Sequence, residues 1–347
     1  MNVARTDGRV PPGGRLLEVE DLHVKFFTRR GVAHAVRGVS FRIDAGETLG
    51  LVGESGSGKS VTALALMGLI RLPGRITAGD VRWKGRSLLG PGGERLLAGI
   101  RGREIAIVFQ DPMTSLNPLF TVGFQIGEVL RHHLGIGRDQ ARRRAIELLE
   151  MVGIAFPEQR VDQYPHEFSG GMRQRMLIAM ALACEPELLI ADEPTTALDV
   201  TIQAQILELL AELQRRLGIA VLLISHDLGV VAQVCHRIAV MYAGHIVETG
   251  AAEEVFSRPG HPYTEGLLRS TPRLDRVESR LQGIDGSPPD LIHPPPGCPF
   301  HPRCRLADER CPAQMPPLED HDGREVACWH AFGRRVGEEA GAGTSHG

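Results

Sequence analysis

A glycine-rich segment, GESGSGKS at Gly53–Ser60, limits the folds open to this chain more than any other feature of the sequence. It follows a short apolar run (48–53) that favours a strand, and it leads into a run (59–70) with the spacing of a helix. The glycines allow the loop to curl with its backbone N–H groups turned inward, where they can bind phosphate oxygens. The segment therefore predicts a nucleotide phosphate site on a strand–loop–helix unit.

The residue types within this loop indicate how a nucleotide would be held. Lys59 can place a positive charge on the β- and γ-phosphates, and Ser60 can offer its hydroxyl to Mg²⁺. The spacing does not fit a dinucleotide fingerprint, because the third glycine of that pattern would fall on Val61. We expect the nucleotide to contact Gly53, Glu54, Ser55, Gly56, Ser57, Gly58, Lys59, Ser60 and Thr62.

Strands and helices alternate along most of the chain, which predicts an α/β fold with a mostly parallel sheet. The stretch 111–170 is expected to be mainly helical. Beyond about residue 256 prolines become dense, and HPPPGCPFHPRC is expected to have no regular structure. The expected strands are 16–27, 39–43, 48–53, 103–110, 188–193 and 220–225, and the expected helices are 59–70, 171–184 and 201–218.

Polar residues end three of the expected apolar strands, where ligands gather in a parallel sheet. Asp192 can hold Mg²⁺, and Glu193 can accept a proton from the water that attacks the γ-phosphate. His226 is a candidate γ-phosphate contact, and Gln110 a candidate sensor of Mg²⁺ and water. Each has a plainer reading, because an acidic pair can be a solvated turn and a lone histidine is often structural.

A second candidate anion site lies in HEFSGGMRQR, where a helix is expected to begin near Ser169, Gly170 and Gly171. The first N–H groups of a helix lack backbone partners and the helix dipole is positive there, so this end can bind an anion. The alternative is an ordinary helix start. The sequence alone leaves open why the chain needs two such sites.

The order of these motifs, from the phosphate loop through the strand-end Gln, FSGGM, LLIADEP and TALD to SHD, resembles the ATP-binding subunits of ABC transporters over about residues 15–260. In that family two nucleotide domains pack head to tail. The resemblance implies that Ser169, Gly170 and Gly171 bind the ATP held by the partner's loop and that Asp199 lies at the same interface. Hydrolysis then removes the charge that joins the two subunits.

The chain departs from the family's signature at two positions. Phe168 and Met172 stand where Leu and Gln are usual, so a polar role for residue 172 is lost. The resemblance also implies an aromatic residue that stacks on adenine. Phe26 is the first choice by its offset from the loop, and Phe27 is the alternative.

The resemblance implies a P-loop NTPase core with an N-terminal antiparallel β subdomain, an inserted helical subdomain and a Cys/Pro-rich C-terminal extension. The expected division is a flexible tail at 1–14, an ATP-binding domain at 15–258 with its helical subdomain at about 111–180, and an extension at 259–347 with a disordered end. GHPYTEGLLRSTP and the cysteines resemble importers of di- and oligopeptides, whose relatives carry nickel or glutathione.

Four of the six cysteines crowd into this extension, at Cys298, Cys304, Cys311 and Cys328. They contain no C-x2–4-C pair of the kind that zinc sites usually have, and a reducing compartment disfavours disulfides. We expect these four cysteines to hold a 4Fe–4S cluster, which some similar peptide importers carry, and a zinc ion with His301 or His330 or free thiols are the alternatives. Cys184 and Cys235 lie in apolar segments and are expected in the core.

Composition excludes several classes of protein. The 347 residues carry a formal net charge of −3, so we expect no general nucleic-acid binding. No apolar run reaches the roughly 18 residues of a membrane span, and the N-terminus has no signal core, so we expect the cytosol.

We therefore expect an ATPase that binds ATP and Mg²⁺ and powers a membrane importer of di- and oligopeptides, as a peripheral subunit at the cytoplasmic face of the inner membrane. Its expected partners are a second ABC ATPase subunit, identical or not, two transmembrane permease subunits and an extracytoplasmic solute-binding protein. An ABC ATPase that acts on ribosomes or DNA, and an ATP sensor without turnover, are the alternatives. The transported solute is not specified by this chain.

Overall fold

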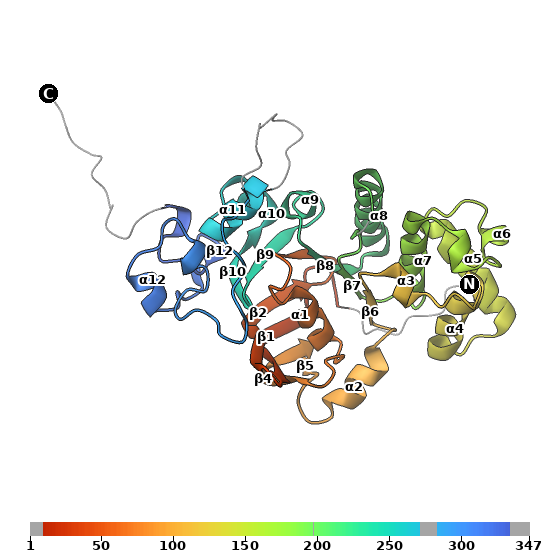
Figure 1. Ribbon diagram of the computed structural model, residues 1–347. Helices are drawn as coiled ribbons and strands as arrows, with labels where there is room; N and C mark the ends of the chain where they lie inside the picture. The colour runs from red at the N-terminus through yellow and green to blue at the C-terminus, as the bar shows by residue number, and fades with distance from the viewer. Residues whose placement is uncertain (1–9, 197, 271–282, 334–347) are drawn as a thin grey trace.

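Two β-sheets form the centre of the computed structural model, which describes residues 10–196, 198–270 and 283–333 (Figure 1). One sheet is antiparallel and the other is mixed. A group of helices lies beyond one end of the mixed sheet, and the C-terminal extension lies at its other end. This agrees with the expected α/β core with an antiparallel β unit and inserted helices.

The antiparallel sheet has the strand order β2–β1–β4–β5. A tight hairpin joins its two long strands, with Phe26 paired to Ala33 and Thr28 to Gly31. The strand β4 was not predicted, because polar and glycine residues interrupt its apolar pattern. The bounds are β1 (Arg15–Thr28), β2 (Gly31–Asp44), β4 (Gly74–Trp83) and β5 (Arg86–Ser87).

The mixed sheet has the order β11–β12–β10–β9–β3–β8–β7–β6, and its strands β9, β3, β8, β7 and β6 are parallel. Every residue of β3, β7 and β8 is buried, as expected for strands covered on both faces. The bounds are β3 (Thr48–Val52), β6 (Ile105–Val108), β7 (Leu188–Asp192), β8 (Ala220–Ser225), β9 (Arg237–Tyr242), β10 (His245–Ala251), β11 (Glu319–His321) and β12 (Arg324–Val326).

Because the parallel strands point the same way, their carboxyl ends meet at one edge of the sheet. The phosphate loop follows β3, and Gln110, Glu193 and His226 come just after β6, β7 and β8. The sequence predicted each of these strands to within a few residues. The edge therefore gathers the residues that the motifs had singled out.

The helix after the phosphate loop is shorter than predicted. It ends at Leu66, because Gly68 takes a left-handed φ of 60° and the N–H of Leu69 bonds back to the carbonyl of Leu64. The helices are α1 (Lys59–Leu66), α2 (Gly93–Ile100), α3 (Pro112–Ser115), α4 (Val122–Leu134), α5 (Arg138–Met151), α6 (Pro157–Arg160), α7 (Gly170–Leu182), α8 (Val200–Leu217), α9 (Leu228–Val231), α10 (Ala252–Ser257), α11 (Pro262–Ser270) and α12 (Arg310–Ala313).

Helices α4, α5 and α7 pack together at the end of the molecule beyond β6 (Figure 1). Thr121 caps the start of α4 by accepting a bond from the N–H of Phe124, and Gly135 ends that helix in a left-handed conformation. Buried residues on their facing sides, such as Ile126, Leu148 and Ile178, join the core cluster under the mixed sheet. This group falls within the helical subdomain expected at about 111–180.

The segment HPPPGCPFHPRC (293–304) is irregular as expected, apart from the 3-10 turn His301–Arg303, but the extension beyond it contains two strands that were not predicted. Strand β12 pairs with β10, so the extension adds the hairpin β11–β12 to the edge of the mixed sheet. Short 3-10 turns at Pro165–Glu167, His301–Arg303 and Ala331–Gly333 complete the chain's helical elements. The apolar pattern missed these elements because each is only three residues long.

A buried carboxylate fixes the extension to the sheet. Glu248 on β10 is fully buried and accepts hydrogen bonds from the backbone N–H of Gly260 and His261, at 2.7 and 2.9 Å. It also forms a buried ion pair with Arg324 on β12, with Nη2 and Oε1 2.6 Å apart. Three donors thus offset the cost of burying this charge.

The expected flexible tail lies mostly outside the described residues. The last residues of this tail are bonded to the core: the N–H of Gly13 donates to the carbonyl of Ala45, and the N–H of Ala45 donates to the carbonyl of Gly14. The expected disordered end of the chain also lies outside the described residues from 334 onward.

Candidate functional site

The phosphate loop is held close to neighbouring backbone, which explains two of its glycines. Gly53 has a φ of 157°, and a Cβ on it would lie 2.2 Å from the carbonyl oxygen of Met241. Gly58 has a φ of 109°, and its Cβ would lie 2.4 Å from the carbonyl oxygen of Ala35. Any side chain at either position would force the loop off the sheet.

Lys59 opens helix α1 and lies in the curl of the loop. Its Nζ donates to the carbonyl oxygens of Gly53 and Glu54, at 2.8 and 3.0 Å, and lies 3.9 Å from Oε1 of Glu193. Burial lowers the pKa of Lys59, while the charges of Glu193, Asp192 and Glu54 oppose that effect. The ammonium is thus a concentrated charge in a site with few competing water contacts.

Ser60 and Asp192 form the pair of oxygens expected for Mg²⁺. The hydroxyl of Ser60 donates to Oδ1 of Asp192 at 2.9 Å. Asp192 is buried at the end of β7, and burial raises its pKa. A hydroxyl and a carboxylate are hard oxygen donors of the kind that Mg²⁺ prefers. The donor set therefore fits the ion.

Glu193 is the point where the strand-end residues meet. Its Oε2 accepts hydrogen bonds from Nε2 of Gln110 at 3.1 Å and from the hydroxyl of Thr196 at 2.9 Å, and it lies 3.5 Å from Nδ1 of His226. Glu193 also has a positive φ of 47°, a conformation that a non-glycine residue rarely adopts. Such strain is common at sites where a side chain must point in one direction.

The charges around Glu193 keep it ionised. Its hydrogen bond with His226 is the largest cause of a lowered pKa, and the same contact raises the pKa of His226. A carboxylate in this state can accept a proton from water. The predicted cluster of Gln110, Glu193 and His226 thus forms in the structure, although its role in hydrolysis stays a prediction.

Thr62 and Ser57 behave differently from the rest of the loop. Thr62 is fully buried, and its hydroxyl donates to the carbonyl of Gly58 inside the helix, so its predicted contact with the nucleotide gains no support. The hydroxyl of Ser57 is buried and has no hydrogen-bond partner among the described residues. A group of this kind is a site where a ligand oxygen can supply the missing partner.

The second predicted anion site also begins a helix. Ser169 is the N-cap of α7, and its hydroxyl accepts a bond from the N–H of Met172 at 3.4 Å. Ser169 and Gly170 are exposed. Gly171 lies against α8, and a Cβ on it would approach Cγ2 of Ile202 to 2.6 Å, which explains a glycine at that position.

Asp199 caps the neighbouring helix. Its Oδ1 accepts the N–H of Ile202 at 2.9 Å, so the starts of α7 and α8 are side by side. The side chains of Ser169 and Asp199 each accept a hydrogen bond from an N–H of the helix that they cap. Because Ser169 is exposed, a second molecule can reach its hydroxyl.

The two candidate adenine-stacking residues have different surroundings. Phe26 is half-buried, and its ring lies against Gly74, where an added Cβ would come within 2.6 Å. Phe27 is more exposed, and the guanidinium of Arg75 lies 6.0 Å from its ring centre. The choice between them stays a prediction.

Three residues at the site were not predicted from the sequence. Thr196 follows Glu193 by three positions, which is the spacing of the two ends of a turn, and this spacing could have indicated a contact between them. Tyr263 and Arg303 reach the phosphate loop from the extension, through Glu54. They lie 209 and 249 positions away from Glu54 in the sequence, and no local sequence pattern predicts such contacts.

The four cysteines of the extension lie in one region of the structure, where their thiols influence one another's pKa. Burial raises the pKa of Cys298 to about 11 and that of Cys328 to about 12, and the neighbouring thiols add to both effects. The N–H of Cys298 donates to the carbonyl of Cys311 at 2.8 Å, Cys304 raises the pKa of Cys298, and Cys311 raises the pKa of Cys304. Cys184 and Cys235 are half-buried and lie elsewhere.

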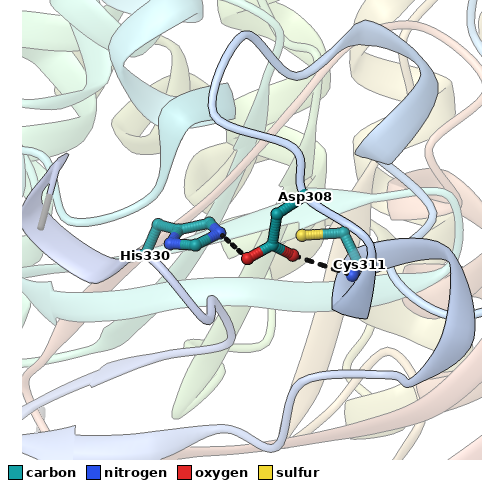
Figure 2. A group of neighbouring side chains, drawn as sticks. All are labelled: Asp308, Cys311 and His330. Atoms are coloured by element: carbon teal, nitrogen blue, oxygen red, sulfur yellow. Dashed lines mark hydrogen bonds and ion pairs between the residues drawn. The ribbon is translucent and has the colours of Figure 1, made fainter. Parts of the chain in front are cut away.

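A tighter group of candidate ligands overlaps this set. Figure 2 shows the carboxylate of Asp308 between the ring of His330 and Cys311. The candidate ligand atoms of these three residues all lie within 4.8 Å of one another, and His330 Nε2 is 3.0 Å from Oδ2 of Asp308. His330 was named as a possible ligand from the sequence, whereas Asp308 was not.

Two family models match this chain. The ABC transporter model matches residues 36–196, which include the phosphate loop and Glu193. The model described as the C-terminal region of oligopeptide/dipeptide transporters matches residues 247–311. Together they cover most of the site, though not Asp199 or His226, and the start of the extension.

Similar curated proteins align along most of the chain. The oligopeptide transport ATP-binding protein OppD of Bacillus subtilis is 56% identical over 318 residues, covering 91% of this chain and 88% of that protein. The dipeptide transport ATP-binding protein DppD of Escherichia coli is 51% identical over 314 residues, covering 90% and 96%.

Solved structures share the fold. An ATP-binding cassette solved as a dimer in a post-hydrolysis state, bound to ADP and Pi, is 28% identical with a TM-score of 0.61 and covers 68% of this chain and 99% of its own. The cbiO1 protein of Clostridium perfringens, part of the cbiONQ ABC transporter complex, is 30% identical with a TM-score of 0.60, covering 70% and 91%.

Proposed function

Because this chain belongs to the ABC transporter family of ATP-binding proteins, we propose that it is the ATP-hydrolysing subunit that drives a membrane importer of di- and oligopeptides. The observation that carries the hydrolytic part is the position of Glu193, held by Gln110, Thr196 and His226 beside Lys59. The similarity to peptide transport proteins over about nine-tenths of the chain supports the class of cargo.

The residues of the loop explain how ATP would be held. Inward-facing N–H groups and Lys59 bind the phosphates, and Ser60 and Asp192 hold Mg²⁺, which neutralises the phosphate charge when it is bound. Glu193 accepts a proton from the attacking water, while Gln110 and His226 orient its carboxylate. The pKa of Glu193 is lowered, so the base is ready at neutral pH.

Hydrolysis also requires a second copy of the nucleotide domain. Ser169 and Gly170 are exposed at the start of α7, Gly171 beside them is half-buried against α8, and Asp199 caps that neighbouring helix. We assign these residues to the ATP bound on a partner subunit, identical or different. Closing the dimer then depends on the γ-phosphate, and its loss opens the dimer.

The remaining assignments concern the surroundings of the protein. None of the helices within the described ranges is long and apolar enough to cross a membrane. We propose that two permease subunits hold the chain at the cytoplasmic face of the cell membrane and that a solute-binding protein delivers the cargo outside. An action on ribosomes or DNA is not favoured, because these relatives, which align with about nine-tenths of the chain, are transport proteins.

We assign a 4Fe–4S cluster to Cys298, Cys304, Cys311 and Cys328. The four thiols are gathered, and burial makes their charged forms costly unless a cation offsets the charge. A cluster also spaces its ligands more widely than one ion does, because they surround several irons. The alternative is a single zinc ion on Asp308, Cys311 and His330, which the short distances in that group favour.

The experiment for the main proposal is reconstitution in vesicles with the two permeases, the partner ATPase and the solute-binding protein. Peptide uptake and ATP hydrolysis should appear together and both should stop with Lys59→Ala, whose charge the phosphates need. Hydrolysis without any dependence on permeases or peptide would overturn the importer assignment. Absence of MgATP binding to the parent chain would overturn the ATPase assignment itself.

A further inference from the structure

The second residue of the phosphate loop is anchored by the C-terminal extension. Nη1 and Nη2 of Arg303 lie 2.6 and 3.0 Å from the two carboxylate oxygens of Glu54. Only 5% of the Arg303 side chain is exposed, compared with 26% for Glu54. A two-bonded pair of this kind fixes direction as well as distance, and it is among the stronger charged contacts in proteins.

The extension also holds the backbone of the same residue. The N–H of Glu54 donates to the hydroxyl oxygen of Tyr263 on α11 at 2.7 Å. Tyr263 is fully buried, and burial raises its pKa, so the phenol stays neutral. The side chain and the main chain of Glu54 are thus both bonded to the region after residue 260.

The position of Arg303 depends in turn on the cysteine segment. Its Nε donates to the carbonyl of Asp285 at 2.9 Å, and its backbone belongs to the 3-10 turn His301–Arg303. That turn begins with a bond from the N–H of His301 to the carbonyl of Cys298 and ends with one from the N–H of Cys304 to the carbonyl of His301. Two of the cysteines that we assign to the cluster, Cys298 and Cys304, are therefore bonded to this turn on either side of it.

We propose that Arg303 is a positioning residue for the phosphate loop, and that it couples ligation of the four cysteines to nucleotide affinity. This inference rests on the proposed function, because it concerns nucleotide bound on that loop. When the cysteines hold their metal group, the turn is fixed and Arg303 keeps Glu54 in place. When they do not, the turn loosens, and the loop loses part of its preorganisation for phosphates.

A plainer role for the pair would be to fasten the extension to the core without affecting the loop. The two roles differ in one measurable quantity, because only the positioning role predicts a change in nucleotide affinity in a folded protein. Coupling between two sites is also reciprocal. Bound nucleotide must therefore stabilise the metal group by the same factor that the metal group strengthens nucleotide binding.

The first test is calorimetric binding of MgADP to the purified full chain. Arg303→Gln should weaken binding about tenfold, an ordinary size for coupling between sites. The matched control is Arg305→Gln, on the other side of Cys304, whose exposed side chain pairs with Glu265. The control should change affinity by less than about twofold, because exposed ion pairs contribute little. Equal affinities for the parent and Arg303→Gln would overturn the proposal.

A second variant keeps the test valid if Arg303→Gln does not fold. Glu54→Gln removes the charge on the other side of the pair and should weaken MgADP binding by a similar factor. The double variant should be no weaker than either single one, because both changes break the same contact. Effects that simply multiply would show that the two residues act separately and would contradict the proposal.

The third arm measures metal directly. Iron and zinc that remain on the protein are followed during exposure to an iron chelator, with and without MgADP. The nucleotide should slow metal loss from the parent chain and should not slow it from Arg303→Gln. An equal rate of loss from the parent with and without MgADP would disprove the coupling to the cysteines.

These outcomes separate this inference from the proposed function. If the parent binds MgADP, Lys59→Ala does not, and Arg303→Gln binds like the parent, the inference alone fails. If the parent chain itself does not bind MgADP, the proposed function fails first.

Discussion

Gln110 and Glu193 meet at the ends of the adjacent strands β6 and β7, with Nε2 of the amide 3.1 Å from Oε2 of the carboxylate. They are 83 positions apart in the sequence. The parallel register, in which Val108 lies opposite Ala191, brings them to the same edge. The candidate sensor of Mg²⁺ and water and the candidate base are therefore in direct contact.

Replacing the candidate base tests this arrangement. Glu193→Gln removes the proton acceptor while keeping the shape of the side chain, so ATP should still bind. Turnover should fall by roughly 10²–10⁴-fold, the usual contribution of a positioned base. Steady-state phosphate release measures the rate, and light scattering should detect an ATP-bound dimer.

The matched control is Glu187→Gln, just before the start of the same strand, where the carboxylate pairs with Lys84 instead of the site. It should leave turnover close to that of the parent chain. If Glu193→Gln hydrolysed ATP at the parent's rate, another group would have to be the base.

The exposed start of α7 predicts an effect on the other subunit. Ser169→Arg places a long cation where the partner's γ-phosphate is expected, so it should block hydrolysis there while its own loop still binds ATP. Mixing it with Lys59→Ala in a homodimer tests this assignment. A mixed dimer has one site that lacks both the lysine and the serine and one site that keeps both, so it should regain activity at the intact site.

Labelled nucleotide and single-turnover hydrolysis measure which site is active. Recovery to about half of the parent's rate is expected if the sites act independently, since one of two sites is intact. No recovery in a verified mixed dimer of independent sites would contradict the assignment of Ser169 to the partner's nucleotide. Arg138→Gln, at the exposed start of α5, is a control change at another helix terminus.

The cysteine segment predicts a distinct spectrum. Protein purified without oxygen should be brown, with a broad absorption band that disappears on reduction, because iron–sulfide charge transfer gives these clusters their colour. Metal analysis should find iron and acid-labile sulfide. Cys328→Ser should lose the band, whereas Cys184→Ser should keep it, because Cys184 lies outside the group. Colourless protein with one zinc per chain would instead support the group of Asp308, Cys311 and His330.

The anchor of the extension predicts a loss of stability. Glu248→Gln removes a fully buried charge and leaves Arg324 without its ion pair, so the free energy of unfolding should fall by about 3 kcal/mol. Urea unfolding followed by circular dichroism measures it. The control is Glu254→Gln on the exposed face of α10, which should change the free energy by less than about 0.5 kcal/mol. Equal stability of the two variants would show that the Glu248 contacts contribute little.

The pair of His226 and Glu193 predicts a dependence on pH. Contact with Glu193 raises the pKa of His226, so this histidine stabilises the folded state fully below its unfolded pKa of about 6.5. That contribution is lost as the pH rises through the raised folded value. The difference in unfolding free energy between the parent and His226→Gln should therefore shrink from acidic to alkaline pH. A difference that grew with pH would contradict the assigned ion pair.

The sequence by itself determined the local chemistry of the nucleotide site. A phosphate loop requires glycines that no side chain can replace, and apolar strands that end in acidic or amide residues have a periodicity that can be read directly. The order of these motifs identified the family. The strands β3, β6, β7 and β8 were predicted to within a few residues for the same reason, whereas β9 was missed and β2 begins eight residues before the predicted start.

Only the tertiary structure decided how distant segments meet. Thr62 fits the loop motif by position but is buried in its helix, and the short strands β11 and β12 form because β10 offers an open edge. The contact between Arg303 and Glu54 depends on the path of the whole extension around the sheet. Such contacts are set by the packing of residues more than two hundred positions apart, and no local pattern contains that information.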